Sequence, residues 1–293
     1  MDKVGEKIVI SGKIGAGKSE MRRHLLQKLN ETGYNFRAMG MGDEVFRKFA
    51  LEYANEARSR GIDIPEGREV AEFSKICKQN KEYDRIMDKY LVELGKSEEN
   101  LVIDARRGCE FIPHAFKIFL DITLDEAARR RFNDKSGTGE AYSSFEMAKS
   151  EVKKREESQD ERYRAADGTL PYKNIDNYNV ILSTTYIPLE RTGEAIDYII
   201  KAKKQFEKDS NYQVVLLSPK EIIVIDRGAK EKVETISGKL PIIQKGDRFY
   251  VDSKYEPIIK KAIEEDKLLL ESEISERDRV NQLNHNMNKE MSH

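Results

Sequence analysis

One segment of the sequence has the residue types and spacing that suit phosphate binding. Residues 12–19 read Gly-Lys-Ile-Gly-Ala-Gly-Lys-Ser, which fits the pattern GxxxxGK[ST], and they follow an apolar run at residues 8–10. In this pattern the glycines let backbone N–H groups approach phosphate oxygens, the lysine reaches the outer phosphates, and the serine hydroxyl binds magnesium. The apolar run predicts a strand, and residues 21–29 have the apolar spacing of a helix whose N-terminus points at the anion. The segment therefore predicts a phosphate-binding loop for ATP and Mg2+, formed by Gly12, Lys13, Ile14, Gly15, Ala16, Gly17, Lys18 and Ser19.

Composition limits the remaining classes of protein. The chain of 293 residues is long enough for one large or two modest domains, and its net charge is only -1 although 36% of its residues are charged. No global field therefore draws it to nucleic acid or to a membrane. Cys77 and Cys109 lack metal-ligand spacing and are too few for a disulfide framework, which suits a reducing compartment. No apolar stretch approaches membrane-spanning length, so we expect a soluble, cytoplasmic protein without a secretion signal.

Strand-like and helical segments alternate over the first two thirds of the chain. The expected strands are residues 7–10, 101–104, 117–121 and 180–183, and a helix over residues 191–206 closes the unit. Such alternation predicts a mostly parallel sheet covered on both faces, an α/β fold with three layers.

The character of the sequence changes near residues 208–211. Four short apolar runs with turn residues between them predict a small strand-rich α+β module, and residues 271–293 are polar and predict a solvated helix or a frayed tail. The expected strands of this module are residues 214–217, 222–225, 240–243 and 249–251. The resulting division is a domain at residues 1–207, a small domain at 212–272 and a polar tail at 273–293.

Three features favour a small phosphotransferase over a motor, a switch or a helicase. Only one helical insertion fits between the loop and the strand that ends at Asp104. That insertion is charged and could hold a phosphorylated acceptor. A third segment, residues 129–164, is rich in arginine around a flexible turn at residues 136–139 and could close as a lid, because arginines stabilise the charge of a transferred phosphoryl group where water is excluded.

Each of these features also has a structural interpretation. Lid arginines at helical spacing could simply pair with Glu156, Glu157 and Glu161 on a solvated face. Asp104 could cap a strand end, although strand ends beside a phosphate loop usually face the ligand crevice.

Residues 7–204 resemble the cytidylate kinase-like branch of the nucleoside monophosphate kinases, a P-loop kinase family. The matching segments follow the loop in order: Gly-Asp-Glu-Val-Phe-Arg at residues 42–47, Val-Ile-Asp-Ala-Arg at 102–106, Arg-Glu-Glu at 155–157 and the strand near residue 180. The resemblance implies a helical acceptor-binding insertion, a lid, and transfer of a phosphoryl group from ATP. Two residues depart from the family pattern: Ala105 replaces a glycine, and Gln159 stands where some members carry an acidic residue.

The segment from Ser-Pro at residues 218–219 to the helix expected at 257–265 bears a fainter resemblance to the ParB-like nucleotide-binding fold. The Gly and Arg pair that builds a phosphate site in that family is absent here, since residues 253–256 read Ser-Lys-Tyr-Glu. The resemblance implies an appendage that recruits a substrate or a protein partner, and a purely structural role is equally compatible.

These observations lead to one main functional hypothesis and two alternatives. The main one is an Mg2+-dependent kinase that transfers the γ-phosphoryl group of ATP to a pyrimidine nucleotide. Its predicted catalytic residues are Lys18, Asp104, Arg130, Arg155 and Arg162; its acceptor-binding residues are Asp43, Arg47, Asp84, Asp88 and Arg106; its metal ligands are Ser19 and Asp104. The first alternative is a kinase for hydroxymethylated pyrimidines within DNA, with nucleic acid as the acceptor. The second is a nucleotide-dependent binding protein whose C-terminal module contacts a protein partner.

Overall fold

The computed structural model describes residues 4–80, 82–134, 142–167, 171–225, 239–245 and 248–274. The chain forms two compact units, one of Met1–Leu120 with Leu124–Tyr178 and the other of Asp121–Thr123 with Asn179–His293. The second unit includes the strand and helix that follow residue 179, which the sequence pattern groups with the first domain. The domain boundary expected near residues 208–211 stays a prediction.

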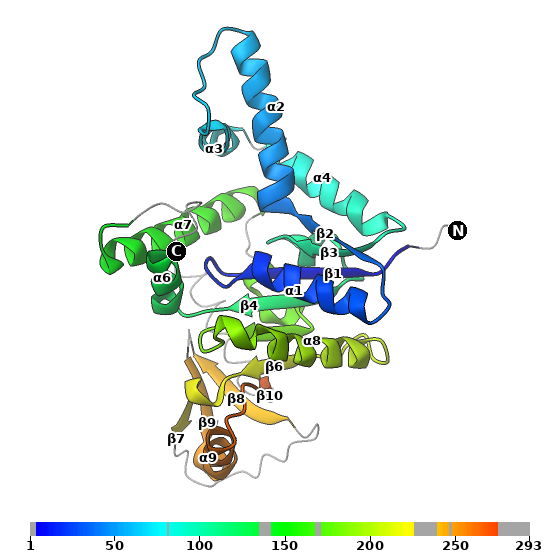
Figure 1. Ribbon diagram of the computed structural model, residues 1–293, viewed down its shortest axis with the longest axis vertical. Helices are drawn as coiled ribbons and strands as arrows, with labels where there is room; N and C mark the ends of the chain where they lie inside the picture. Colours follow the sequence, from blue (N-terminus) through cyan, green and yellow to red (C-terminus); the bar gives the residue numbers. More distant parts are fainter. Residues whose placement is uncertain are drawn as a thin grey trace. The chain divides into compact units, whose positions relative to one another are not determined.

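The first unit is built on four parallel strands in the order β2-β3-β1-β4 (Figure 1). These strands are β1 (Lys7–Gly12), β2 (Phe36–Gly40), β3 (Asn100–Asp104) and β4 (Phe116–Asp121). All six residues of β1 are buried, as a central strand with both faces covered requires. The strands expected at residues 7–10, 101–104 and 117–121 are confirmed, and β2 is a strand that the sequence pattern did not indicate.

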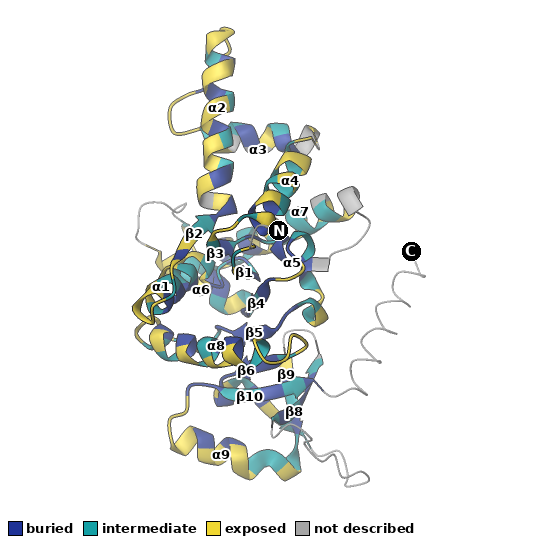
Figure 2. Ribbon diagram, turned by 90° about the vertical axis from the view of Figure 1, so that its right-hand side faces the viewer, coloured by how far each residue is buried: buried dark blue, intermediate teal, exposed yellow. Residues whose placement is uncertain are grey.

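Helices cover this sheet on both faces. α1 (Lys18–Glu31) packs against β1, β2 and β3, and it buries Met21, Leu25 and Leu29. On the other face lie α4 (Glu82–Lys96) and the short α5 (Gly108–Phe111), and Leu91 of α4 joins a core cluster with Val9. Figure 2 shows α1 and α5 on opposite sides of the strands. The three-layer α/β arrangement predicted from the alternation of elements is therefore present.

A helical insertion separates β2 from β3. It begins with a π-helical turn, η1 (Met41–Val45), and continues as α2 (Phe46–Ser59) and α3 (Glu69–Gln79). Phe73 is buried between the two helices, where its ring contacts those of Phe46, Tyr53 and Tyr83 at centroid distances of 5.0, 5.6 and 4.8 Å. This aromatic cluster holds the helices of the insertion together.

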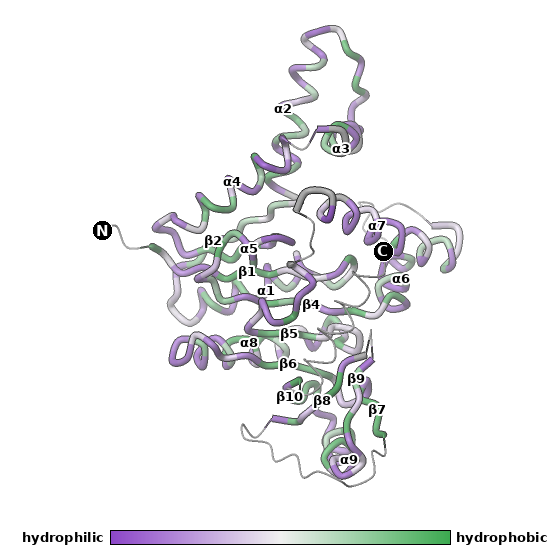
Figure 3. The backbone as a smooth tube through the Cα atoms, turned by 180° about the vertical axis from the view of Figure 1, so that it is seen from behind, coloured by the Kyte–Doolittle hydropathy of each residue, from purple (hydrophilic) through white to green (hydrophobic). Residues whose placement is uncertain are grey.

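Two further helices form the segment that the sequence identifies as a lid. α6 (Leu124–Asn133) packs against α7 (Phe145–Asp167), and two short 3-10 turns, η2 (Pro171–Lys173) and η3 (Ile175–Asn177), follow. Figure 3 draws α7 largely as hydrophilic and the central strands as hydrophobic. The flexible turn expected at residues 136–139 lies outside the described residues.

The second unit contains a mixed sheet in the order β5-β6-β10-β8-β9-β7. Its strands are β5 (Val180–Ser183), β6 (Val214–Leu217), β7 (Ile222–Ile225), β8 (Leu240–Lys245), β9 (Arg248–Asp252) and β10 (Leu270–Ile274). Its helices are η4 (Leu189–Arg191), α8 (Thr192–Phe206), η5 (Pro219–Glu221), η6 (Ser253–Tyr255) and α9 (Glu256–Glu264). The expectation of a helix or tail from residue 271 is wrong for residues 271–274, because β10 pairs with β6 and β8 there. Among the described helices none is long and apolar enough to cross a membrane.

Candidate functional site

The loop that follows β1 has a backbone shape that requires glycine. Gly12 has φ +147°, and a Cβ atom there would lie 2.3 Å from the carbonyl oxygen of Leu120. Gly15 has φ +80°, and its Cβ atom would lie 3.0 Å from the Cβ of Ala127. The Lys13 N–H donates a hydrogen bond of 3.1 Å to the Leu120 carbonyl, which fixes the start of the loop to β4. The loop therefore has the tight form, with backbone close to its surroundings, that the motif predicts.

Lys18 begins α1, and its ammonium group folds back over the loop. Its Nζ donates to the carbonyl oxygens of Gly12 at 3.2 Å and Lys13 at 3.0 Å. Burial, followed by the charge of Arg106, lowers the pKa of Lys18 to about 8, although Asp104 and Glu156 act in the opposite direction. Because the charged form is poorly solvated, an anion bound beside Lys18 would restore its preference for the protonated state.

Ser19 and Asp104 meet where β1 and β3 end. The parallel register pairs Ile10 with Asp104, so the carboxylate lies at the same edge of the sheet as the loop. The Ser19 hydroxyl donates to Oδ2 of Asp104 at 3.4 Å. Hydroxyl and carboxylate oxygens are ligands that Mg2+ accepts, and this cation usually takes few protein ligands and keeps several waters. The two predicted metal ligands are thus close enough to serve one ion, while the described residues contain no group of three or more His, Cys, Asp or Glu suited to a metal.

Arg106 is held beside the loop by its backbone and its side chain. The Ser11 hydroxyl donates to the Arg106 carbonyl at 2.7 Å, and the preceding N–H, of Ala105, donates to the Ile10 carbonyl at 3.0 Å. Its guanidinium lies 5.4 Å from the centroid of the Tyr172 ring and 3.8 Å from a carboxylate oxygen of Glu156. The arginine is therefore close to both the phosphate loop and α7.

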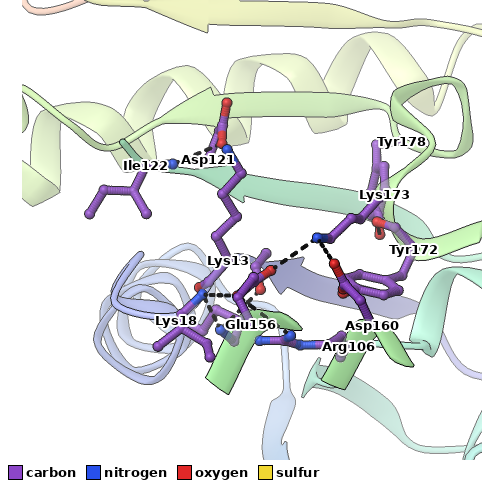
Figure 4. Close-up of polar contacts among 12 residues, drawn as sticks. Lys13, Lys18, Arg106, Asp121, Ile122, Glu156, Asp160, Tyr172, Lys173 and Tyr178 are labelled. Atoms are coloured by element: carbon purple, nitrogen blue, oxygen red, sulfur yellow. Dashed lines mark hydrogen bonds and ion pairs between the residues drawn. The ribbon is translucent and has the colours of Figure 1, made fainter. Parts of the chain in front are cut away.

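α7 directs acidic side chains at this site (Figure 4). Oε2 of Glu156 accepts a hydrogen bond of 3.2 Å from the backbone N–H of Ile14, in the middle of the loop. Its other oxygen, Oε1, lies 3.5 Å from Nζ of Lys173. One turn further along α7, Asp160 accepts from the Tyr172 hydroxyl and pairs with Lys173 at 2.5 Å. Two carboxylates on one face of α7 thus contact the loop, Arg106 and the segment that follows α7.

Among the predicted lid arginines that the structure describes, Arg130 lies against the loop. Its Nη1 donates to the Gly15 carbonyl at 3.4 Å, while its Nε donates to Glu126 at 2.9 Å. Arg155 is exposed on α7, and the side chain of Arg162 lies outside the described residues. Arg130 therefore pairs with a neighbouring carboxylate and lies against the loop, while its role as a phosphate ligand stays a prediction.

The predicted acceptor-binding residues are more scattered. Arg47 is exposed on α2, Asp84 is half-buried on α4, and the side chain of Asp43 lies outside the described residues. Asp88 pairs with Arg107 at 3.0 Å. The acceptor roles of these residues stay predictions.

Comparison with known proteins shows the family of the chain. A cytidylate kinase from Methanobrevibacter smithii is 31% identical over 182 residues, which cover 60% of this chain and 88% of that protein. The chain belongs to the cytidylate kinase family. It therefore has the fold of P-loop kinases and is a phosphotransferase that acts as a nucleotide kinase.

Other comparisons give weaker similarities. A second member of the cytidylate kinase family, from Methanosphaera stadtmanae, is 27% identical over 67% of this chain and 99% of its own length. An S-adenosylmethionine-dependent nucleotide dehydratase from Lacinutrix mariniflava is 28% identical over 65% of this chain, which spans only 35% of that protein. Among solved structures, shikimate kinase from Bacteroides thetaiotaomicron overlaps 67% of the chain and 98% of its own with a TM-score of 0.41 and 13% identity, a weak likeness. No protein-family model matches the sequence.

Some residues of the candidate site were not predicted from the sequence. Glu156 is expected only as an ion-pair partner, Asp160 is not among the expected site residues, and Tyr172 and Lys173 follow a stretch without regular spacing. The available signal was helical periodicity: Glu156, Gln159 and Asp160 lie at i, i+3 and i+4 and so share a face of α7. Oε1 of Gln159 is buried without a hydrogen-bond partner among the described residues.

Proposed function

We propose that this nucleotide kinase transfers the γ-phosphoryl group of ATP to a pyrimidine nucleoside monophosphate of the CMP, dCMP or UMP type. The observation that carries the proposal is the convergence of Lys18, the Ser19–Asp104 pair and Arg106 at one edge of the parallel sheet. The naming of several relatives as cytidylate kinases supports the pyrimidine acceptor.

Each group has a role that follows from its position. Loop N–H groups and Lys18 bind the triphosphate, and Ser19 with Asp104 would hold Mg2+, which when bound neutralises charge on the phosphate oxygens. Arg130, already against the loop, stabilises charge on the transferred group. Arg106 orients the acceptor, because Ser11 holds its backbone carbonyl and its guanidinium lies over the ring of Tyr172. Rate enhancement then comes mainly from alignment and electrostatics.

The test is an acceptor panel with ATP labelled at the γ-phosphate. CMP, dCMP and UMP are compared with purine monophosphates and with DNA that contains hydroxymethyluracil. We expect labelled diphosphates from the pyrimidine monophosphates alone. Label that appears only in DNA supports the alternative of a base-modifying kinase, and tight ATP binding without any product supports the binding-protein alternative; either result refutes the proposal.

Matched variants connect the activity to the site. Lys18→Ala removes the ammonium group that faces the loop and should lower kcat by about 100-fold or more, since one lost electrostatic donor costs that much in comparable sites. Lys96→Ala, at an exposed position in the last turn of α4, is the control and should leave kcat unchanged. Arg106→Lys should raise KM for the monophosphate more than KM for ATP, because an ammonium group cannot reproduce the planar guanidinium contacts.

A further inference from the structure

Glu156 makes a contact whose chemistry conflicts with nucleotide binding. Ile14 lies in the loop whose backbone N–H groups the motif directs at phosphate oxygens. In the structure the Ile14 N–H donates to Oε2 of Glu156 at 3.2 Å. A carboxylate oxygen and a phosphate oxygen cannot both occupy the position in front of one donor, and two anions that close repel each other strongly where water is excluded.

The surroundings of Glu156 strengthen this conflict. Its side chain is only 19% exposed, and Oε2 also faces Nη1 of Arg106 at 3.8 Å, an arginine that is only 11% exposed. Its negative charge favours the protonated form of Lys18. Glu156 thus supplies to the loop amide, Lys18 and Arg106 the negative charge that a phosphate group would supply.

We propose that Glu156 is a gate on the phosphate loop: it docks α7 onto the loop and competes directly with the nucleotide phosphates, which must displace it. This inference rests on the proposed function, because it concerns the same phosphate site. Lys173 provides the partner for the displaced carboxylate, since its Nζ lies 3.5 Å from Oε1, the oxygen that does not accept from the Ile14 N–H. Nucleotide binding and the position of the lid are therefore coupled through one side chain.

Because Glu156 and the nucleotide phosphates compete, a gain of affinity for the nucleotide is the diagnostic result. A residue that only supports the structure weakens binding when it is replaced, whereas a competitor strengthens binding when it is removed. Loss of one charge-assisted hydrogen bond to the loop corresponds to about a tenfold change in the dissociation constant.

The experiment is isothermal titration calorimetry of MgADP with the full chain and three variants. Glu156→Gln should bind about tenfold more tightly than the unmodified chain. Glu156→Asp keeps the charge but is too short to reach the Ile14 N–H, so it should also bind several-fold more tightly. The control is Glu157→Gln, which removes the same charge from an exposed neighbour paired with Lys153 at 3.8 Å and should leave affinity within about twofold.

Several outcomes overturn the inference. Unchanged or weaker binding by both Glu156 variants shows that no competition exists. Tighter binding by Glu156→Gln alone shows a general charge effect and not displacement. If Glu156→Gln does not fold, as thermal unfolding monitored by circular dichroism would show, Glu156→Asp decides the question. Absence of MgADP binding by the unmodified chain refutes the proposed function itself, so the two failures are distinguishable.

Discussion

The state of protonation of Lys18 should control nucleotide affinity in mildly alkaline solution. Burial and the nearby guanidinium of Arg106 lower the pKa of Lys18 to about 8. A bound diphosphate or triphosphate places negative charge beside Nζ and raises that pKa again, so the complex binds a proton that part of the free protein lacks. Affinity is therefore constant below pH 7 and falls as the pH rises through 8.

The size of the effect follows from the titration of one group. At pH 8 about half of the free protein carries a neutral Lys18, and at pH 9 about nine tenths does. Binding of MgADP should therefore take up about half a proton at pH 8, and its dissociation constant should increase about tenfold between pH 7 and pH 9.

Calorimetry in two buffers with different ionisation enthalpies measures both quantities. The difference between the observed heats gives the number of protons taken up, and the isotherms give the dissociation constant at each pH. Lys18→Arg is the control, because arginine stays protonated over this range and its binding should not vary with the titration. A dissociation constant independent of pH, with equal heats in both buffers from pH 7.5 to 9, would refute the reasoning.

Three further predictions concern stability and are measured by urea unfolding. Gly12→Ala should lower the free energy of unfolding by about 2 kcal/mol or more, because its Cβ atom would lie 2.3 Å from the Leu120 carbonyl oxygen, whereas Gly193→Ala, with open space around it, should not. Arg107→Ala should lower the free energy of unfolding by about 3–5 kcal/mol, because it leaves the carboxylates of Asp88 and Glu110 without the buried guanidinium that pairs with them at 3.0 and 2.8 Å. A loss below about 1 kcal/mol contradicts the prediction. Burial raises the pKa of Glu221 to about 7, so its ionisation destabilises the folded state as pH rises from 4.5 to 7. Glu221→Gln should therefore stabilise the protein by up to about 3 kcal/mol more at pH 8 than at pH 4.5, and a difference independent of pH would contradict this.

The elements that the sequence predicted share a local signal. The phosphate loop depends on glycines and a lysine within eight consecutive positions, and the central strands are short apolar runs because both of their faces are buried. The structure of such elements can be predicted from their own residues, without knowledge of their partners in the fold. The same holds for α8, whose buried residues recur at helical spacing.

The elements that were missed depend on partners far along the chain. β2 has a buried residue at each end with Arg37 exposed between them, so it shows neither an apolar run nor strict alternation. β10 includes Glu271 and Glu273, whose charges suggested a tail, but its backbone pairs with two strands and Glu271 pairs with Lys201. For the same reason the contact of Glu156 with Ile14 could not be read from the charged pattern of α7, because 142 positions separate the two residues.

The two interpretations of the arginines, as ion-pair partners and as phosphate ligands, are consistent with each other in this fold. Arginines gathered near a phosphate site repel one another until an anion arrives, so each needs a carboxylate nearby to be stable. Glu126 forms an ion pair with Arg130 at 2.9 Å, and Glu156 forms one with Arg106 at 3.8 Å. The near-zero net charge of the chain is thus compatible with a strongly basic site, because the carboxylates that balance the arginines lie beside them. What decides phosphate binding is which carboxylate can move away, and Glu156, with Lys173 as a second partner, is placed to do so.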